Sequence, residues 1–480
     1  MNTVVDYFKN NVRDSPKKTA LIYDKQILSY EQLNKLVSST SASISNLEKK
    51  SVVSIFIENS SDFIISYLGI LNAGLIAHLI PTYLSNQKIK QQLDNANPSL
   101  IISSNSLIDK INDIQYKCKK VVVTELTGNK FMETFHNSAV EDIACLIYTS
   151  GTTANPKGVS ITHSNYVFTT NNIIKILNYN KSDINILPLP LSHSFGLGCL
   201  HASLFVGATL VVLENAMNTM LILESIKKNS ATTLAAIPLT LTKILKEHNS
   251  IISDYLSRIR LIITNSTSIP VETVKNYQKI LKNGKLATYY GLTEASRSTF
   301  MVFDRLGKEN SVGISPEGIK IKIQNDSSNE LESGEILIKG KNVITKYWNN
   351  VQADENIIDN WLRTGDLGHK DSDGYLYLDG RLDNLINTAG EKVLPEDIEK
   401  VVKVLTGIDD VIAVGMKNEM FGQVVKIFVQ KSFYSKITKS DILTHCIKNL
   451  ERFKVPREIE FVENFSRNEF GKIQRFKLQQ

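Results

Sequence analysis

A chain of 480 residues, of which 42% are hydrophobic and 22% charged, is long enough for more than one packed core, so we expect two or more domains. The formal net charge of +6 is spread along the chain rather than gathered in blocks, which favours anionic small molecules over nucleic acid as binding partners. Four widely spaced cysteines exclude a C-x-x-C motif and a disulfide framework, and fit a reducing compartment: Cys118, Cys145, Cys199 and Cys446.

The first residues, 1–12, have apolar positions spaced as in a short amphipathic helix and lack the basic and apolar regions of a signal peptide. The most apolar stretch, residues 66–81, contains Asn72 and His78 and stops at Pro81, which makes it too short for a membrane span. We therefore expect a soluble, cytoplasmic protein without a membrane span.

Up to about residue 310, short β-rich runs alternate with segments of helical period. The helical segments include residues 61–75 and 220–229, and the β-rich runs are residues 52–57, 99–103, 120–126, 208–214 and 260–265. This alternation predicts parallel strands joined by crossover helices, an α/β architecture.

The pattern changes twice towards the C-terminus. Residues 318–340 read as short strands with turns, which predicts a small, largely antiparallel sheet. From about residue 384 a helix at 394–405 is mixed with strands at 411–417 and 424–431, which indicates a separate α+β domain. We place the large N-terminal domain at residues 1–380 and the small C-terminal domain at residues 384–480.

Residues 145–165 form one unusual segment, with a strand, a hydroxyl-rich loop, a second strand and then a helix for which Ser164 is the expected N-cap. Backbone N–H groups and hydroxyls in such a loop bind anions with several oxygens, and Lys157 adds a mobile positive charge. Pro156 before this lysine and Gly158 after it exclude the P-loop pattern of NTPases. A polar turn without a ligand is the alternative. The loop residues are Thr149, Ser150, Gly151, Thr152 and Thr153.

Further motifs follow in a fixed order, each weak alone and specific together. With this loop included, they are "YTSGTTANPKGV" (148–159), "YYGLTEAS" (289–296), "GEILIKG" (334–340), "WLRTGDLG" (361–368), "DGRLDNLINTAGEKVLPEDIE" (379–399) and "FGKIQR" (470–475). In these motifs nearly the whole chain resembles the ANL superfamily of adenylate-forming enzymes, which includes acyl- and aryl-CoA synthetases, carrier-protein adenylation domains and firefly luciferase.

The resemblance implies attack of a carboxylate on the α-phosphorus of ATP, which gives an acyl-adenylate and pyrophosphate. It makes Tyr290 the aromatic side chain against adenine, Thr293 the α-phosphate ligand and Glu294 the carboxylate that helps to hold Mg²⁺. It makes Asp366 and Arg381 the ribose ligands, and the hydroxyl-rich loop with Lys157 the site of the outer phosphates. In isolation each of these residues is also compatible with a purely structural role.

The resemblance also implies a mobile C-terminal domain that serves both halves of the reaction. Lys472 matches the adenylation lysine, which bridges the two anions, and such preorganised donors contribute roughly 3–4 kcal/mol. The domain then rotates about a hinge at residues 381–383, with Asp383 as the hinge residue, so that the loop at Gly390 admits the pantetheine thiol of CoA. The alternatives are an exposed surface lysine and a glycine that only turns a hairpin.

The acyl pocket is assigned in the same way to His193, Phe195, Tyr289 and Arg297. Residues 187–200 contain no acidic side chain, which disfavours an amino acid substrate because a buried ammonium needs a counter-charge. Arg297 leads to the hypothesis of a second anionic or strongly polar group on the substrate, as in a dicarboxylate or keto acid. A salt bridge to a neighbouring loop is the alternative.

The chain departs from the family pattern at several positions around the expected nucleotide and acyl sites. Asn265 and Ser266 stand where relatives have small residues, Ala154 where the phosphate loop usually has glycine, and Thr288 where an amide is usual. The lysine motif lacks its usual proline and threonine lead-in. These changes concern the shape of the pocket more than adenylation.

Three functions remain open. The first is an AMP-forming ligase that joins a carboxylic acid to CoA. The second is a stand-alone adenylation enzyme that loads an acyl group onto the phosphopantetheine of an acyl carrier protein, or onto an amine. The third is a non-catalytic sensor of nucleotide or acyl ligands, against which the joint presence of Lys472, Glu294, Asp366 and Arg381 argues.

Overall fold

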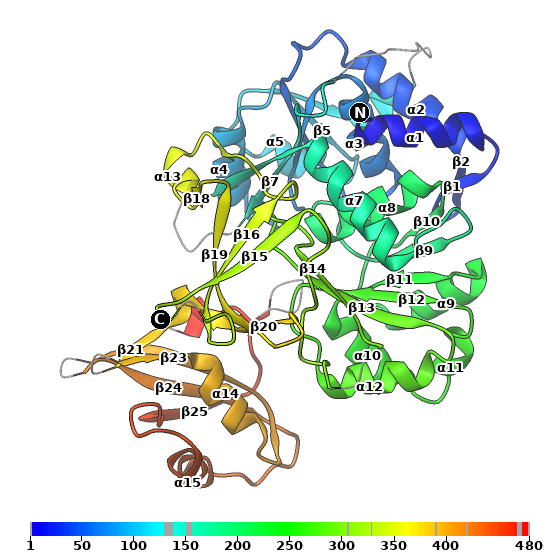
Figure 1. Cartoon of the computed structure of the whole chain (residues 1–480). Coiled ribbons are helices and arrows are strands. Elements are labelled where there is room, and N and C mark those ends of the chain that lie inside the picture. The colour runs from blue at the N-terminus through cyan, green and yellow to red at the C-terminus, as the bar shows by residue number, and fades with distance from the viewer. Residues whose placement is uncertain are drawn as a thin grey trace. The chain divides into compact units, whose positions relative to one another are not determined.

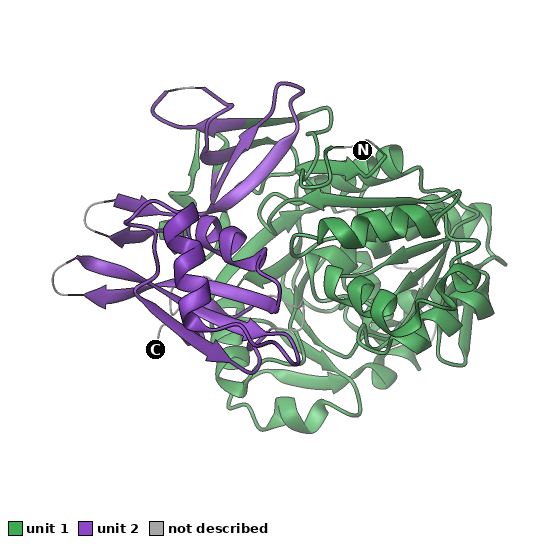
Figure 2. Cartoon of the chain, turned by 90° about the horizontal axis from the view of Figure 1, so that it is seen from below, with its two compact units in different colours: residues 1–321, 338–362 green, residues 322–337, 363–480 purple. Residues whose placement is uncertain are grey.

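The computed structural model describes residues 2–128, 138–149, 156–304, 307–327, 329–388, 391–418, 421–467 and 473–478. The chain forms two compact units, which Figure 2 colours separately. Unit 1 comprises residues 1–321 and 338–362, and unit 2 comprises residues 322–337 and 363–480. This division by contacts places residues 322–337 and 363–380 in unit 2, whereas the sequence predicts a boundary at residues 380–384; that domain boundary stays a prediction.

Unit 1 contains two large sheets, and the first of them carries the hydroxyl-rich segment (Figure 1). Its inner strands are parallel, as expected, while β8 and β17 are added antiparallel at one edge. The strand order is β17 (Tyr347–Trp348), β8 (Lys157–Thr162), β7 (Ile143–Thr149), β4 (Ile76–Leu79), β3 (Val52–Phe56), β5 (Leu100–Ser103) and β6 (Lys119–Val122).

The second sheet is parallel in its six inner strands and has an antiparallel strand at each edge. Strands buried on both faces are apolar throughout, which explains the continuous apolar runs in the sequence. The strand order is β14 (Thr299–Val302), β13 (Lys285–Tyr290), β12 (Leu261–Thr264), β11 (Thr233–Ala235), β9 (Ile184–Leu187), β10 (Thr209–Val212), β1 (Thr19–Tyr23) and β2 (Gln26–Ser29).

Helices connect these strands, and the expected α/β architecture is confirmed. Among them α8 is buried along most of its length, because every residue from Phe195 to Phe205 is buried. The helices of unit 1 are α1 (Val4–Asp14), α2 (Tyr30–Ser43), α3 (Ser61–Asn72), α4 (Asn86–Ala96), α5 (Ile108–Asn112), α6 (Val123–Thr127), α7 (His163–Leu177), α8 (Ser194–Val206), α9 (Thr219–Asn229), α10 (Pro238–His248), α11 (Ile252–Tyr255), α12 (Val271–Ile280) and α13 (Val351–Asp354).

Two local predictions were wrong. The strand expected over residues 120–126 ends at Val122, because the Glu125 carboxylate accepts a hydrogen bond from the Val122 N–H at 3.1 Å and starts α6. The N-cap of α7 is Thr162 rather than Ser164. The Thr162 hydroxyl accepts from the Asn165 N–H at 3.1 Å while Asn165 Oδ1 accepts from the Thr162 N–H at 2.9 Å, a reciprocal capping arrangement.

The small sheet expected after residue 310 is present, and its β19 pairs antiparallel with β18 and β20. Along β15 the residues alternate between buried and exposed, as in a sheet with one solvated face. The strands are β15 (Ile319–Gln324), β16 (Gly334–Gly340), β18 (Ile357–Ile358), β19 (Trp361–Lys370) and β20 (Leu376–Arg381).

The C-terminal part of unit 2 is the expected α+β fold, in which a sheet packs against α14 (Pro395–Lys403) and α15 (Lys439–Asn449). The strand order is β22 (Glu391–Val393), β21 (Ile386–Thr388), β24 (Gly422–Lys431) and β23 (Ile408–Asn418), with β25 (Glu458–Val462) parallel to β24; short helical turns cover Leu382–Asn384 and Arg475–Leu478. Within the described ranges no helix is both long and apolar enough to cross a membrane.

Candidate active site

The strands β7 and β8 flank the hydroxyl-rich loop and pair antiparallel. Thr149 ends β7 and Lys157 begins β8, and their Cα atoms are partners in the ladder, so the two residues lie side by side at the ends of these strands. The remaining predicted phosphate ligands lie outside the described residues: Ser150, Gly151, Thr152 and Thr153. A cavity of about 840 Å³ adjoins the start of β8 and is lined by Lys157 and, among others, Asn95, Asn349 and Gln352.

The loop between β13 and β14 carries Thr293, Glu294 and Arg297 in one tight turn that starts after Tyr290, itself a buried residue at the end of β13. A Cβ at Gly291 would lie 2.5 Å from the main-chain nitrogen of Arg297, so the turn requires glycine there. Glu294 is only 9% exposed. Its Oε1 accepts a hydrogen bond of 3.3 Å from the hydroxyl of Tyr347.

Tyr347 connects this turn to strand β8. It lies on β17, whose residues pair with β8 in the register Tyr347 to Val159 and Trp348 to Gly158. Burial, together with the Glu294 carboxylate, raises the pKa of the Tyr347 phenol, which therefore stays protonated and donates to Glu294. The structure thus brings Glu294 and the start of β8, predicted from separate motifs, to the same strand edge.

Sequence reasoning missed Tyr347. The residue lies in "KYWNN", where an aromatic pair precedes two asparagines, but nothing in that pattern distinguishes a carboxylate partner from a core aromatic. The contact joins residues 53 positions apart in the chain, and only the tertiary fold reveals it.

The four predicted acyl-pocket residues also gather in unit 1. The rings of Phe195 and Tyr289 meet edge to face with centroids 5.5 Å apart, and the Arg297 guanidinium carbon lies 4.6 Å above the Tyr289 ring. His193 is the N-cap residue of α8, directly before the turn that contains Phe195. The Phe195, Tyr289 and Arg297 side chains therefore form one cluster, although they come from two distant motifs, and His193 precedes Phe195 by two residues in the chain.

His193 has a partner that the sequence did not reveal. The Tyr83 hydroxyl lies 3.1 Å from His193 Nε2, and the two rings stack with centroids 6.0 Å apart. Burial lowers the pKa of His193 to about 4, so the imidazole is neutral near pH 7. A neutral imidazole beside an acyl site can donate or accept a hydrogen bond without adding charge.

In unit 2 the predicted ribose ligands form their own cluster. Asp366 on β19 and Arg381 on β20 are Cα partners in the ladder and form an ion pair between the carboxylate and the guanidinium. Arg381 also contacts Asp383, the predicted hinge residue, at 3.2 Å. Asp366 and Arg381 are therefore oriented by one another, as paired ligands of a diol would be.

The other two unit 2 residues of the prediction, Gly390 and Lys472, lie outside the described residues, and their roles stay predictions. In the part of the chain that the structure describes, no group of three histidine, cysteine or acidic side chains could hold a metal ion. A single carboxylate such as Glu294 nevertheless suits Mg²⁺, which keeps several waters and takes its other ligands from nucleotide phosphates.

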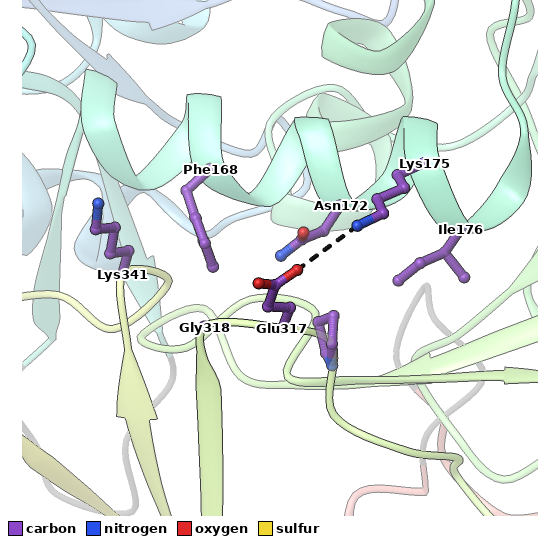
Figure 3. A pocket seen from close by; sticks show the side chains of 8 residues that line it. Phe168, Asn172, Lys175, Ile176, Glu317, Gly318 and Lys341 are labelled. Atoms are coloured by element: carbon purple, nitrogen blue, oxygen red, sulfur yellow. Dashed lines mark ion pairs between the residues drawn. The ribbon is translucent and has the colours of Figure 1, made fainter.

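A second cavity of unit 1, of about 450 Å³, contains none of the predicted site residues (Figure 3). It lies between α7 and the segment before β15, and Lys175 and Glu317 form an ion pair of 3.7 Å at its edge.

Comparison with known proteins identifies the family of this chain. A family model described as AMP-binding enzyme matches residues 8–348, and one described as AMP-binding enzyme C-terminal domain matches residues 397–472. The chain belongs to the AMP-binding enzyme family. The resemblance to the ANL superfamily is thereby confirmed.

Named relatives of this family member span its whole length. It is 26% identical to a 2-succinylbenzoate–CoA ligase of Listeria monocytogenes over 99% of both chains. It is 28% identical to an oxalate–CoA ligase of Arabidopsis thaliana over 99% of this chain and 97% of the relative. These names support AMP-forming acyl-CoA ligase activity, with ATP, a carboxylic acid and CoA as reactants.

Solved structures give the same fold. The o-succinylbenzoate CoA synthetase of Bacillus subtilis, in complex with its acyl-adenylate intermediate, matches with a TM-score of 0.89 and 25% identity, over 99% of this chain and 98% of that one. ATP-bound MatB of Rhodopseudomonas palustris matches with a TM-score of 0.92 and 23% identity, over 100% and 98% of the two chains.

Proposed function

We propose that this AMP-binding enzyme couples a carboxylic acid to CoA in two steps. In the first, a carboxylate oxygen attacks the α-phosphorus of ATP, the bond to the bridging oxygen of the β-phosphate breaks, and pyrophosphate leaves. In the second, the CoA sulfur attacks the acyl carbon, the bond to the AMP oxygen breaks, and the thiol proton is released to solvent. One observation carries the proposal: Tyr347 joins Glu294 to the strand edge that begins at Lys157.

The residues of unit 1 have defined work in the first step. The hydroxyl-rich loop with Thr149 and Lys157 binds the outer phosphates, Thr293 binds the α-phosphate, and Tyr290 packs against adenine. When bound, Mg²⁺ neutralises phosphate charge, and Glu294 would hold it together with the phosphates. The Tyr347 hydroxyl fixes the orientation of that carboxylate.

The residues of unit 2 serve the ribose and both chemical steps. Asp366 and Arg381 bind the ribose hydroxyls, and Lys472 bridges the substrate carboxylate and the α-phosphate. After adenylation the C-terminal domain rotates at Asp383 and the Gly390 loop faces the thiol. His193 stays neutral and positions the acyl group, since burial lowers its pKa.

CoA is the acceptor that the relatives support, because they are named CoA ligases. A carrier-protein phosphopantetheine or an amine is the second candidate. It has the same first step, so the acceptor must be tested directly. The named acids of the relatives, 2-succinylbenzoate and oxalate, each contain two carboxylates, and they direct the substrate screen towards dicarboxylic acids.

The test is pyrophosphate release from ATP·Mg²⁺ with a panel of carboxylic acids, with and without CoA. We expect acid-dependent pyrophosphate release, and CoA-dependent release of AMP with the acids that react. Lys472→Ala should lose pyrophosphate exchange while ATP binding, measured by calorimetry, is kept. Two results would overturn the assignment. One is pyrophosphate release by the wild type that does not depend on any acid, and the other is full pyrophosphate exchange in Lys472→Ala.

A further inference from the structure

Arg297 is an arginine buried without a carboxylate partner. Its side chain lies in unit 1 with 3% of the residue exposed, and its guanidinium is charged at any physiological pH. Among the described residues, none contributes a carboxylate that forms an ion pair with it. Its acceptors are instead the Ser194 carbonyl at 3.2 Å, the Phe195 carbonyl at 3.2 Å and the Ser296 hydroxyl at 2.7 Å.

The Nε of this guanidinium is unused, while both terminal nitrogens make hydrogen bonds. The Arg297 Nε is buried and has no hydrogen-bond partner among the described atoms. A buried charge balanced only by neutral oxygens is costly, and an unpaired buried donor adds about 1–3 kcal/mol to that cost. A residue present only for packing would avoid both penalties. The arrangement is expected if the negatively charged partner of the guanidinium belongs to a ligand rather than to the protein.

The surrounding backbone is shaped for this side chain. Arg297 adopts φ 56°, a conformation that costs free energy in a residue other than glycine. On α8, Gly198 leaves the room that the guanidinium fills, since a Cβ there would lie 2.2 Å from Arg297 Nη2. Both features place a charge at the cost of local stability, which is typical of a binding site rather than of a core.

The position of Arg297 connects it to the acyl group. Its guanidinium covers the face of Tyr289, and it contacts the first turn of α8, which His193 caps. It also lies three residues after Glu294 in the same turn. We propose that Arg297 binds a second carboxylate, at the end of the acid opposite to the one that is adenylated, so that the preferred substrate is a dicarboxylic acid.

This inference rests on the proposed function and names its substrate class. The incoming carboxylate accepts a charge-assisted hydrogen bond from Nε and supplies the missing negative charge, while the aromatic rings of Tyr289 and Phe195 contact the carbon chain between the two carboxylates. An acid that ends in a methyl group cannot accept a hydrogen bond from Nε or neutralise the guanidinium charge, so Arg297 adds no binding energy for that acid.

The experiment compares pairs of acids of equal chain length that end in a carboxylate or in a methyl group. Pyrophosphate release gives kcat/KM for each acid in the wild type, Arg297→Gln and Arg297→Lys. We expect the wild type to prefer the dicarboxylate by about 100-fold. Arg297→Gln should lose that preference through the dicarboxylate alone, and Arg297→Lys should keep part of it.

Arg260→Gln is the matched control. Arg260 is also a partly buried arginine of unit 1, but its guanidinium is paired with the carboxylate of Asp183. Thermal melting separates loss of folding from loss of recognition, and we expect Arg260→Gln to lower the melting temperature while the ratio of the two rates stays unchanged.

The outcomes distinguish this inference from the proposed function. Equal rates for the two acids of each pair in the wild type, or an equal fall for both in Arg297→Gln, would overturn the role of Arg297 while the ligase assignment stands. If no acid of either kind releases pyrophosphate, the proposed function itself fails.

Discussion

The bond between Tyr347 and Glu294 makes a sharp prediction for Tyr347→Phe. The substitution removes only the hydroxyl and keeps the ring that packs on β17. The oxygen–oxygen distance of 3.3 Å is long for a hydroxyl donor, so we take the lower end of the range for a bond to a charged group, about 1.5 kcal/mol. If that energy orients Glu294 for catalysis, kcat/KM for adenylation falls by about 10-fold.

Pyrophosphate exchange measured over a series of Mg²⁺ concentrations checks this prediction, because a misoriented Glu294 should also raise the Mg²⁺ concentration required for half-maximal rate. Tyr30→Phe is the control. The Tyr30 hydroxyl is buried and donates to the neutral Ala208 carbonyl at 2.7 Å, so its loss should cost stability without altering the Mg²⁺ dependence. An unchanged rate and Mg²⁺ dependence in Tyr347→Phe would refute the reasoning.

Two more predictions concern protonation and the ribose. Burial lowers the pKa of His163 to about 4, so between pH 6.5 and 4 the unfolded state binds a proton that the folded state does not. The free energy of unfolding therefore decreases as the pH is lowered through this range. Measured by urea unfolding, its slope against pH should be about 1.4 kcal/mol per pH unit larger in the wild type than in His163→Asn, and equal slopes would contradict the prediction. Asp366→Asn should weaken ATP binding by about 10- to 100-fold, as expected for a lost hydrogen bond to a charged group. Calorimetry with 2′,3′-dideoxy-ATP should show little difference from the wild type, and equal weakening for both nucleotides would mean that Asp366 does not act through the ribose hydroxyls.

Much of the fold could be predicted from the sequence, because strands buried on both faces leave apolar runs and turns leave polar punctuation. The strand predicted over residues 52–57 is β3 (Val52–Phe56), and the helix predicted over residues 61–75 is α3, which ends at Asn72. The prediction failed at residues 120–126, where β-branched residues continue past the end of the strand and the Glu125 cap decides the boundary. Such a cap is a single hydrogen bond, which a count of propensities does not register.

The site could be predicted as far as its motifs reach. Glu294 and Arg381 follow from short motifs, whereas the partners that orient them do not. Tyr83 and Tyr347 meet their partners across long stretches of chain, and main-chain carbonyls, which receive two of the hydrogen bonds of Arg297, have no sequence signature. The change at Ser266 was noticed as a departure from small residues. The structure adds that Ser266 adopts φ 90°, a conformation that glycine adopts without steric strain.

The close approach of Gly198 and Arg297 links two positions that are 99 residues apart. A methyl group added to α8 at that point would occupy the space of a guanidinium nitrogen. A larger side chain at position 198 of α8 therefore requires a smaller side chain at position 297 of the turn. Redesign of the enzyme for uncharged acids should begin by enlarging the helix residue and shortening the arginine together, since either change alone leaves a clash or a void.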